Sequence, residues 1–497
     1  MKRKCLLSFC CATLFALAPA ASDASRPDTD VVESYGDAVV ATLRELVAFP
    51  TFHKEGISNA ENPDFKAMTA CLKRKADELG FDFHDYGAVV VFGMGESPRR
   101  LGLITHGDVQ PAEASKWAKG PFTVDVESHP GRLIGRGTED DKGPIAAALM
   151  AMRAVKDRRT PLTRRVELII SYTEESDWEP FMAFLAKTPP PDLNVGLDAE
   201  YPVVVAEKGW VSFSVVIRGE AASRRPSIRS FTGGALLSQV PEDAVAVVDG
   251  ASEGIIATIR AACEADRAVK YTLEPHAGGS LLVRALGVSA HSSKPNEGVN
   301  AITHLAEILS AVRWHRTPAS GAARFIHEMI GTGFYAEEFG HIAYSDAFMG
   351  PMTLSVGTLR EGNGSAEIGI NLRRPVGKDG RVLEAEIREA VAEWSRRSTV
   401  EAELADLLVY DPYDARQAPH VPILLDIFRE YSGQADARPL SMGGGSHARL
   451  LPGGVNFGPV MPGHPYSGHS EHEYIEQDDL MLSLRMYTAM IERLAAR

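Results

Sequence analysis

Residues 101–108 read LGLITHGD, a short apolar run that ends in His106 and Asp108. An apolar run of this length, bounded by charge and glycine, predicts a buried strand. Similar runs lie at 88–92, 166–172 and 193–197, with an Ala/Met-rich helical pattern at 145–155. This alternation predicts an α/β domain with a mostly parallel central sheet that helices cover on both faces.

Side chains that bind metals or move protons stand next to four of these predicted elements. They are His106 and Asp108, Asp140 and Asp141, Glu174 and Glu175, and Asp198. A single aspartate after a strand is usually a turn former or a helix cap. In open α/β sheets, however, ligands bind at the carboxyl ends of the strands, so we expect the four elements to form one site.

Imidazole and carboxylate ligands suit zinc, manganese or cobalt. Two such ions need a bridging carboxylate and further ligands for each ion, and one carboxylate left unligated beside them can act as a base. A second histidine is required, and the C-terminal stretch supplies three candidates, His464, His469 and His472.

The predicted secondary-structure pattern changes twice along the chain. After Gly209 the pattern shifts to alternating strands, at 211–217, 280–286 and 368–372, with helices at 251–265 and 299–312. It then returns to α/β character and ends in an amphipathic helix at 478–495. We therefore expect a catalytic domain in two segments, 21–208 and 409–497, with an α+β domain inserted at 209–408.

Residues 1–20 have the pattern of a secretory signal peptide. Three basic residues precede an apolar stretch at 5–17 that is too short to span a bilayer, and Ala18-Pro19-Ala20 offers a cleavage site. We expect cleavage near Ala21 and export, in a bacterium to the periplasm. The cysteines that remain, Cys71 and Cys263, do not make a disulfide framework and are predicted to be buried packing residues.

The 497 residues carry a net charge of −14 and show ordinary globular composition. An acidic surface repels phosphate backbones and anionic lipid, which argues against a nucleic-acid or membrane-surface partner. A soluble protein that acts on small molecules is the remaining expectation.

The motifs resemble those of the co-catalytic zinc exopeptidases, which include aminoacylase, the carnosinases and the bacterial PepV dipeptidases. The resemblance covers roughly residues 35–495 and preserves the family's order of motifs. The matching stretches are HGDV at 106–109, GRGTEDDKGP at 135–144, EES at 174–176, DAEYP at 198–202, SAHSSKP at 289–295, NLRRP at 371–375, and His469 with Glu473-Tyr474.

The resemblance implies two zinc ions per chain, with manganese or cobalt as alternatives. Its implied ligands are His106 and Asp198 for one ion, Glu175 and His469 for the other, and Asp140 as the bridge. Asp108 would hydrogen-bond His106 and fix its tautomer. Glu174 would be the general base that deprotonates the metal-bridging water and hands the proton to the leaving amine. A cis peptide is implied between Asp140 and Asp141.

In the resembled family the inserted domain is a lid. His291 would stabilise the tetrahedral oxyanion from the lid, and Arg373 would clamp the substrate carboxylate. Gly444, within the glycine-rich stretch 443–445, would line the substrate site. Ser238-Gln239 stand where relatives carry an asparagine before Val-Pro, so the polar contact of that asparagine is not expected here.

The resemblance favours a dipeptidase that cleaves small dipeptides by attack of a metal-bridging hydroxide. Asp198 accompanies dipeptidase and aminopeptidase activity in the family, and the long insertion resembles the PepV lid, which serves its own chain. We therefore expect a monomer, with a homodimer as the alternative. The alternative activity is an N-acyl-amino-acid hydrolase of the aminoacylase or carboxypeptidase type. A catalytically inactive peptide-binding protein would be expected to have lost the base or a ligand, and here all these positions are filled.

Overall fold

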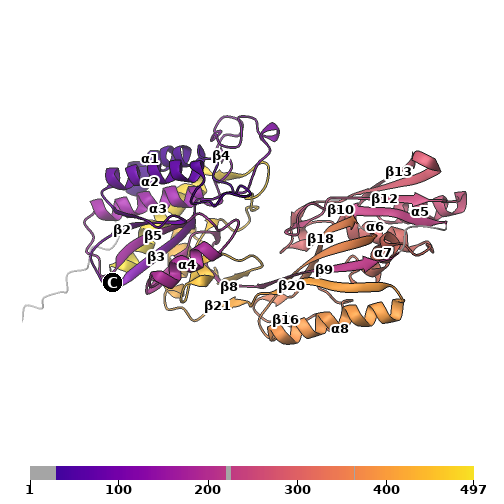
Figure 1. Ribbon diagram of the computed structural model, residues 1–497. Helices are drawn as coiled ribbons and strands as arrows, with labels where there is room; N and C mark the ends of the chain where they lie inside the picture. The colour runs from indigo at the N-terminus through magenta and orange to yellow at the C-terminus, as the bar shows by residue number, and fades with distance from the viewer. Residues whose placement is uncertain (1–28, 220–224, 363, 497) are drawn as a thin grey trace, which may run out of the picture.

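The computed structural model describes residues 29–219, 225–362 and 364–496, which form two lobes, each built around a large sheet (Figure 1). The predicted signal peptide lies outside the described residues. In the described part of the chain, no helix is both long and apolar enough to cross a membrane.

The first lobe contains residues from both ends of the described chain. Its helices are α1 (Thr29–Val47), α2 (Pro63–Leu79), α3 (Lys142–Asp157), α4 (Glu179–Lys187), α9 (Val421–Ser432) and α10 (Gln477–Ala495). Its sheet contains β1 (Asp82–Asp85), β2 (Val89–Met94), β3 (Arg100–His106), β5 (Arg165–Ser171), β6 (Leu193–Gly196), β8 (Val204–Glu207), β21 (Tyr413–Asp414), β22 (Leu440–Met442) and β23 (Val455–Asn456).

The strand order is β1-β2-β5-β3-β6-β23-β8-β21, with β22 also paired to β8. The central strands β5, β3, β6 and β23 are parallel, as the sequence predicts, whereas β1, β2, β8 and β21 pair antiparallel at the flanks. The sheet is therefore mixed. At the β1–β2 flank a tight turn joins the strands, with the Gly87 N–H donating to Asp85 Oδ1, and so short a connection permits only antiparallel pairing.

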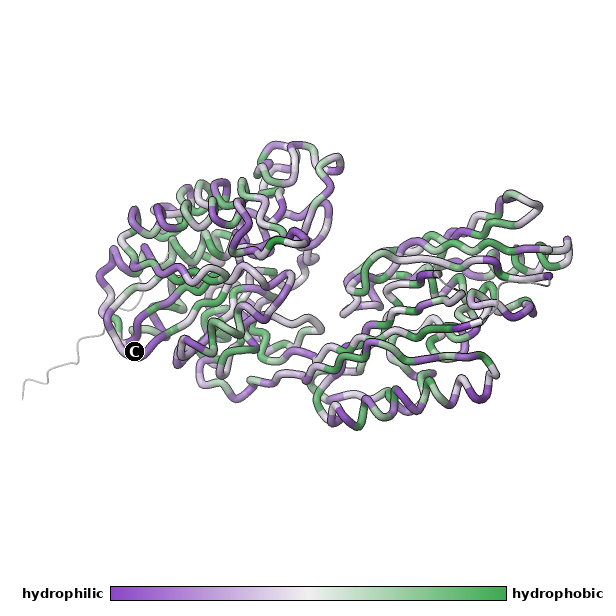
Figure 2. The backbone as a smooth tube through the Cα atoms, viewed as in Figure 1, coloured by the Kyte–Doolittle hydropathy of each residue, from purple (hydrophilic) through white to green (hydrophobic). Residues whose placement is uncertain are grey.

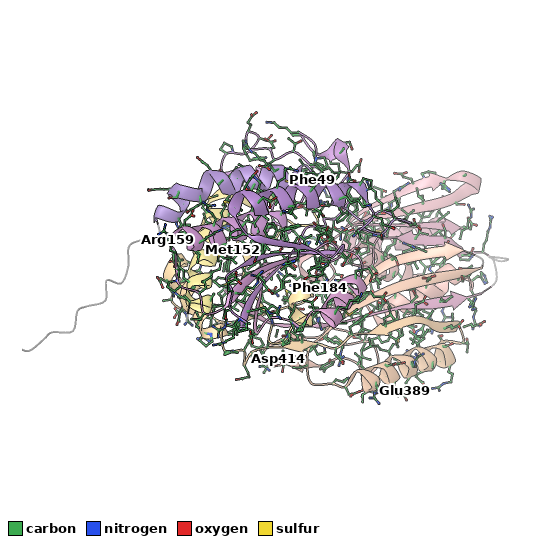
Figure 3. The ribbon with its side chains drawn as sticks, turned by 60° about the vertical axis from the view of Figure 1, so that its left-hand side comes forward. Phe49, Met152, Arg159, Phe184, Glu389 and Asp414 are labelled. Carbon is green, nitrogen blue, oxygen red and sulfur yellow. The ribbon has the colours of Figure 1, made fainter. Side chains whose placement is uncertain are left out.

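Alternating side chains of β2 belong to two apolar clusters, one on each face of the sheet. Val90 belongs to the core under α1, α2, α3, α9 and α10, which also contains Met152 of α3. Its neighbour Val91 belongs to a smaller cluster with Phe184 of α4. Figure 3 labels Met152 and Phe184 on these two helices. Helices therefore cover both faces of the sheet, as the strand–helix alternation predicts.

The second lobe has an antiparallel sheet in the order β13-β14-β12-β10-β18-β19-β9-β20. Its strands are β9 (Gly209–Arg218), β10 (Ser227–Gly233), β12 (Asp243–Asp249), β13 (Lys270–His276), β14 (Ser280–Leu286), β18 (Thr353–Gly362), β19 (Ser365–Arg374) and β20 (Glu401–Val409). Its helices are α5 (Glu253–Ala265), α6 (Ala301–Ser310), α7 (Pro318–Met329) and α8 (Gly380–Ser398).

This lobe has an apolar core of its own. Hydrophobic residues concentrate along its strands (Figure 2). On α8, Trp394 is buried in the core, while Glu389 is exposed on the outer side (Figure 3). Two free cysteines, Cys71 in the first lobe and Cys263 in the second, are buried, which confirms their prediction as packing residues.

The chain passes between the lobes where β8 leads into β9 and where β20 leads into β21. Gly209 lies at this crossing, and a Cβ there would stand 2.4 Å from the Tyr410 carbonyl oxygen and 2.7 Å from the Pro412 nitrogen. The two passing segments therefore approach so closely that only glycine fits at this position.

We predict that His420 makes the fold sensitive to acid. Its ring is buried, Nε2–H donates to the Asn194 carbonyl at 3.2 Å, and burial lowers the pKa of His420 to about 4. The unfolded chain then binds a proton between about pH 6.5 and 4 that the folded chain does not, so stability falls as the pH falls through this window. The loss attributable to His420 is up to about 3 kcal/mol.

Urea unfolding of the metal-free protein at pH 7 and pH 4 measures this loss. His420→Gln should lose less stability between the two pH values than the wild type. His276→Gln, at an exposed position, is the control and should behave as the wild type. An unchanged pH dependence in His420→Gln would contradict the prediction.

Candidate active site

The carboxyl ends of β3, β5 and β6 meet at one edge of the first sheet, because these strands are parallel neighbours. β3 ends at His106, Glu174 and Glu175 follow shortly after β5, and Asp198 follows β6. Asp140 lies just before α3, whose first turn also begins at this edge. The predicted convergence of four chemically active elements therefore occurs in the structure.

Two groups of side chains that could each hold a metal ion meet here. In the first, His106 Nε2 lies 2.8 Å from Asp140 Oδ1 and 3.8 Å from Asp198 Oδ1. In the second, His469 Nε2 lies 2.9 Å from Glu175 Oε1 and 3.1 Å from Asp140 Oδ2. Asp140 belongs to both groups and turns one oxygen towards each. The structure brings together all five side chains expected as ligands.

The hydrogen bonds of His106 fix which ring nitrogen faces the site. Nδ1 lies 3.0 Å from the Asp108 carbonyl oxygen, which can only accept, so Nδ1 carries a proton. In the neutral ring Nε2 then presents a lone pair to Asp140 Oδ1, which is also an acceptor. Two acceptors at 2.8 Å require a proton or a metal cation between them, and an imidazole–carboxylate donor set of this kind fits zinc.

Asp108 is hydrogen-bonded to His106, as expected, but its backbone carbonyl oxygen makes the bond. Its carboxylate Oδ1 is 3.5 Å from His106 Nδ1, so the backbone carbonyl is the nearer acceptor. The carboxylate instead accepts from the backbone N–H groups of Glu174 at 3.2 Å and Glu175 at 2.9 Å. Asp108 thereby ties the end of β3 to the turn that carries both glutamates.

The site brings several carboxylates together, some of them buried and some partly exposed. Burial raises the pKa of Glu174 well above its ordinary value, and the nearby carboxylates of Asp198, Glu175 and Asp140 add to the rise. Burial likewise raises the pKa of Asp198 to about 6 against the opposing effect of His106. Burial alone would lower the pKa of His469, but Glu175 and Asp140 raise it well above its ordinary value. Cations are what such a cluster of carboxylates would favour.

Two buried carboxylates brace segments that lie far apart in the sequence. Glu473 Oε1 accepts from the backbone N–H groups of Glu139 and Asp140, at 3.0 and 3.1 Å. In return, Glu139 Oε2 accepts from the N–H groups of Ser467 and Gly468, at 2.6 and 2.9 Å. This reciprocal brace holds Asp140 against the loop that presents His469. The peptide between Asp140 and Asp141 is cis, as the resemblance implied.

His291 reaches the site from the second lobe. It ends the two-stranded pairing of β15 (Ala290–His291) with β11 (Gln239–Val240), and its ring centroid is 6.4 Å from that of His469. The Ser293 N–H donates to Nδ1 at 3.2 Å, so the neutral ring carries its proton on Nε2. Burial, with the positive charge of Arg373, lowers the pKa of His291 to about 3, which keeps the ring neutral.

Arg373 lies on β19 and is half-buried. Its Nε donates to Asn371 Oδ1 at 3.2 Å, and no carboxylate among the described residues forms an ion pair with it. Burial lowers its pKa to about 10, so the guanidinium remains charged at neutral pH. The charge is therefore available to an anionic partner.

The glycine-rich stretch faces the loop of His291. A Cβ at Gly443 would lie 2.9 Å from Ser293 Cβ, whereas a Cβ at Gly444 would meet nothing within 4 Å. The backbone at Gly444 thus borders open space beside the loop of His291.

The structure separates the three histidines that sequence reasoning left open. His464 pairs with Asp479 at 2.6 Å, and His472 is exposed and belongs to neither candidate metal group. His469 alone of the three joins Asp140 and Glu175.

Two contacts escaped sequence reasoning. The Tyr466 hydroxyl donates to Asp140 Oδ2 at 2.5 Å, and Gln110 Nε2 donates to Glu175 Oε2 at 2.9 Å. Gln110 follows the HGDV stretch directly, which is a signal that could have been used. Nothing in the local sequence singles out Tyr466, because its partner lies 326 residues away.

We predict that Gln110 tunes the second metal group. Its amide occupies Glu175 Oε2 and leaves Oε1 facing His469. Gln110→Ala should weaken zinc binding by about tenfold, because partners that orient a ligand typically contribute that much. Competition against a chromogenic chelator measures the affinity. The exposed Gln417→Ala is the control, and wild-type zinc affinity in Gln110→Ala would contradict the prediction.

Comparisons with known proteins agree with this geometry. The chain is 35% identical to the putative dipeptidase YtjP of Bacillus subtilis (strain 168) over 412 residues, which are 81% of this chain and 84% of that protein. It is 29% identical to the Beta-Ala-Xaa dipeptidase of Lactobacillus delbrueckii subsp. lactis over 478 residues, 94% of this chain and 97% of that protein. Among solved structures, human carnosine dipeptidase 1 matches with a TM-score of 0.55 at 17% identity, over 94% of this chain and 98% of that one, which shows the fold. The sequence model of peptidase family M20/M25/M40 matches residues 102–493. The chain belongs to this family of metallopeptidases.

Proposed function

We propose that the protein is a metal-dependent dipeptidase. The observation that carries the proposal is the double contact of Asp140, which turns one oxygen to His106 and the other to His469. Relatives similar over most of this chain are named dipeptidases or putative dipeptidases, which supports the same activity here.

His106 and Asp198 would hold one metal ion, Glu175 and His469 the other, and Asp140 would bridge them. Zinc is our proposal, and manganese or cobalt fit the same ligand types. When bound, two divalent cations lower the pKa of water and polarise a peptide carbonyl.

Glu174 is the proposed general base. Its side chain belongs to neither metal group, and its backbone N–H is held by Asp108. Burial raises the pKa of its carboxyl, and a carboxylate of raised basicity is suited to take a proton from water and pass it to the leaving amine.

The second lobe, which we propose as a lid comprising residues 209–408, would supply the remaining groups. His291 presents Nε2–H and is neutral, so it can donate to the oxygen that gains negative charge in the reaction. Arg373 would bind the free carboxylate of the substrate, and the backbone near Gly444 would line the site. The ring of His291 lies 6.4 Å from that of the proposed ligand His469, and the charge of Arg373 is near enough to His291 to lower its pKa. This proximity supports a preference for dipeptides over longer peptides.

We further propose that one chain is sufficient for activity. The ring centroids of His291 and His469 in the same chain lie 6.4 Å apart. An ion pair between Lys294 Nζ and Glu200 Oε1, at 2.8 Å, links the loop of His291 to the first lobe. Export by the leader at residues 1–20 completes the proposal and rests on the sequence alone.

A hydrolysis screen tests the proposed substrate class. The purified, zinc-loaded protein should cleave dipeptides, including β-alanyl dipeptides, much faster than tetrapeptides and N-acetyl amino acids. Preference for N-acetyl amino acids would indicate an acylase instead. Comparable rates on tetrapeptides would contradict the closed site.

Glu174→Gln tests the base. The amide keeps the shape of the side chain but cannot accept the proton, so kcat should fall by about a thousandfold. Bound metal, measured by elemental analysis, should be unchanged. Glu179→Gln, five residues on at an exposed position, is the control. Wild-type kcat in Glu174→Gln would rule out this residue as the base.

A further inference from the structure

Trp178 forms a hydrogen bond with the backbone of the proposed base, Glu174, and the proposed mechanism assigns this bond no role. It lies at the start of α4, and its indole Nε1–H donates to the Glu174 backbone carbonyl at 2.8 Å. The Glu174 N–H is held by Asp108 Oδ1 at 3.2 Å. Both polar backbone groups of Glu174 are therefore fixed by side chains, one from β3's end and one from α4.

The other end of the indole reaches the glycine-rich stretch. A Cβ built at Gly445 would lie 3.2 Å from Trp178 Cη2, which is tighter than an ordinary contact. The same Cβ would lie 3.3 Å from Arg449 Nη1. The indole tip thus limits which residue can stand next to Gly444, the proposed substrate-lining position.

A stack of rings holds the indole in this place. Trp178 meets His447 edge to face, with ring centroids 5.1 Å apart and an interplanar angle of 72°. His447 in turn stacks flat on Phe181 of α4, with centroids 4.2 Å apart. His447 is itself buried, so the indole packs against a ring in the interior of the lobe.

We propose that Trp178 is a positioning residue that links the glycine-rich substrate loop to the backbone of the base Glu174. The link rests on the proposed function of Glu174. The rigid indole of Trp178 donates a hydrogen bond to Glu174 at one edge and meets the glycine-rich stretch at Gly445 with the other. A shift of the loop at Gly445 therefore moves the peptide that carries the base.

Removing the indole N–H tests the first half of the link. In Trp178→Phe, kcat on a dipeptide should fall by about tenfold while KM stays within about twofold, because the base is misplaced but substrate contacts remain. Metal content should not change. Trp314→Phe is the matched control: it loses an indole hydrogen bond to a backbone carbonyl, that of Leu309 at 2.7 Å, in the second lobe.

A double-mutant cycle tests the second half. Gly445→Ala should lower kcat/KM in the wild type, and the loss should be smaller in the Trp178→Phe background, because phenylalanine lacks the ring tip that the new methyl group meets. Equal fold-losses in both backgrounds would overturn the link, as would wild-type kcat in Trp178→Phe. If Trp178→Phe does not fold, 3-benzothienylalanine at position 178 replaces the N–H by sulfur at nearly constant shape and takes its place.

Hydrogen exchange gives a readout that needs no substrate. Amides of residues 173–178 should exchange faster in Trp178→Phe than in the wild type and in Trp314→Phe. Unchanged exchange would overturn the inference even in an active enzyme. If the wild type does not hydrolyse dipeptides, the proposed function is wrong. The exchange measurement still decides whether Trp178 stabilises the turn at residues 173–178.

Discussion

The site depends on one constraint: the carboxylate of Asp140 must face two opposed groups of side chains at once. Asp140 meets this constraint because its backbone N–H is held by Glu473 and its peptide lies at the start of α3. Burial raises the pKa of Glu174 and of Asp198, and repulsion from the neighbouring carboxylates adds to the rise. Bound cations would neutralise these carboxylates. The tautomer of His106, which the Asp108 carbonyl fixes, also turns the Nε2 lone pair towards the site, so both features favour metal binding.

The two lobes contribute different parts of this chemistry. The first holds the acidic cluster on the ends of parallel strands and on two loops that brace each other through Glu139 and Glu473. The second contributes a neutral imidazole, His291, and the guanidinium of Arg373, which forms no ion pair with a carboxylate of the described residues. The His291 and His469 rings, whose centroids lie 6.4 Å apart, belong to one chain but to different lobes.

Much of this could be read from the sequence, for physical reasons. Periodicity predicted β14 at its observed bounds and α10 to within one residue, because each is a regular element with a clear apolar face. The convergence of the five candidate ligands followed from strand ends and from motif order. The antiparallel flanks did not, because pairing partners depend on turns and long-range contacts. The contacts of Asp108, Tyr466 and Trp178 also escaped, since each joins segments or backbone atoms that no local pattern marks.

Anomalous X-ray diffraction at the absorption edge of the bound metal tests the central claim most directly. Crystals of the active protein should show two separate anomalous peaks, one beside His106 and Asp198 and one beside Glu175 and His469, with Asp140 next to both. A single peak, or peaks remote from these side chains in a protein that hydrolyses dipeptides, would contradict the shared role of Asp140.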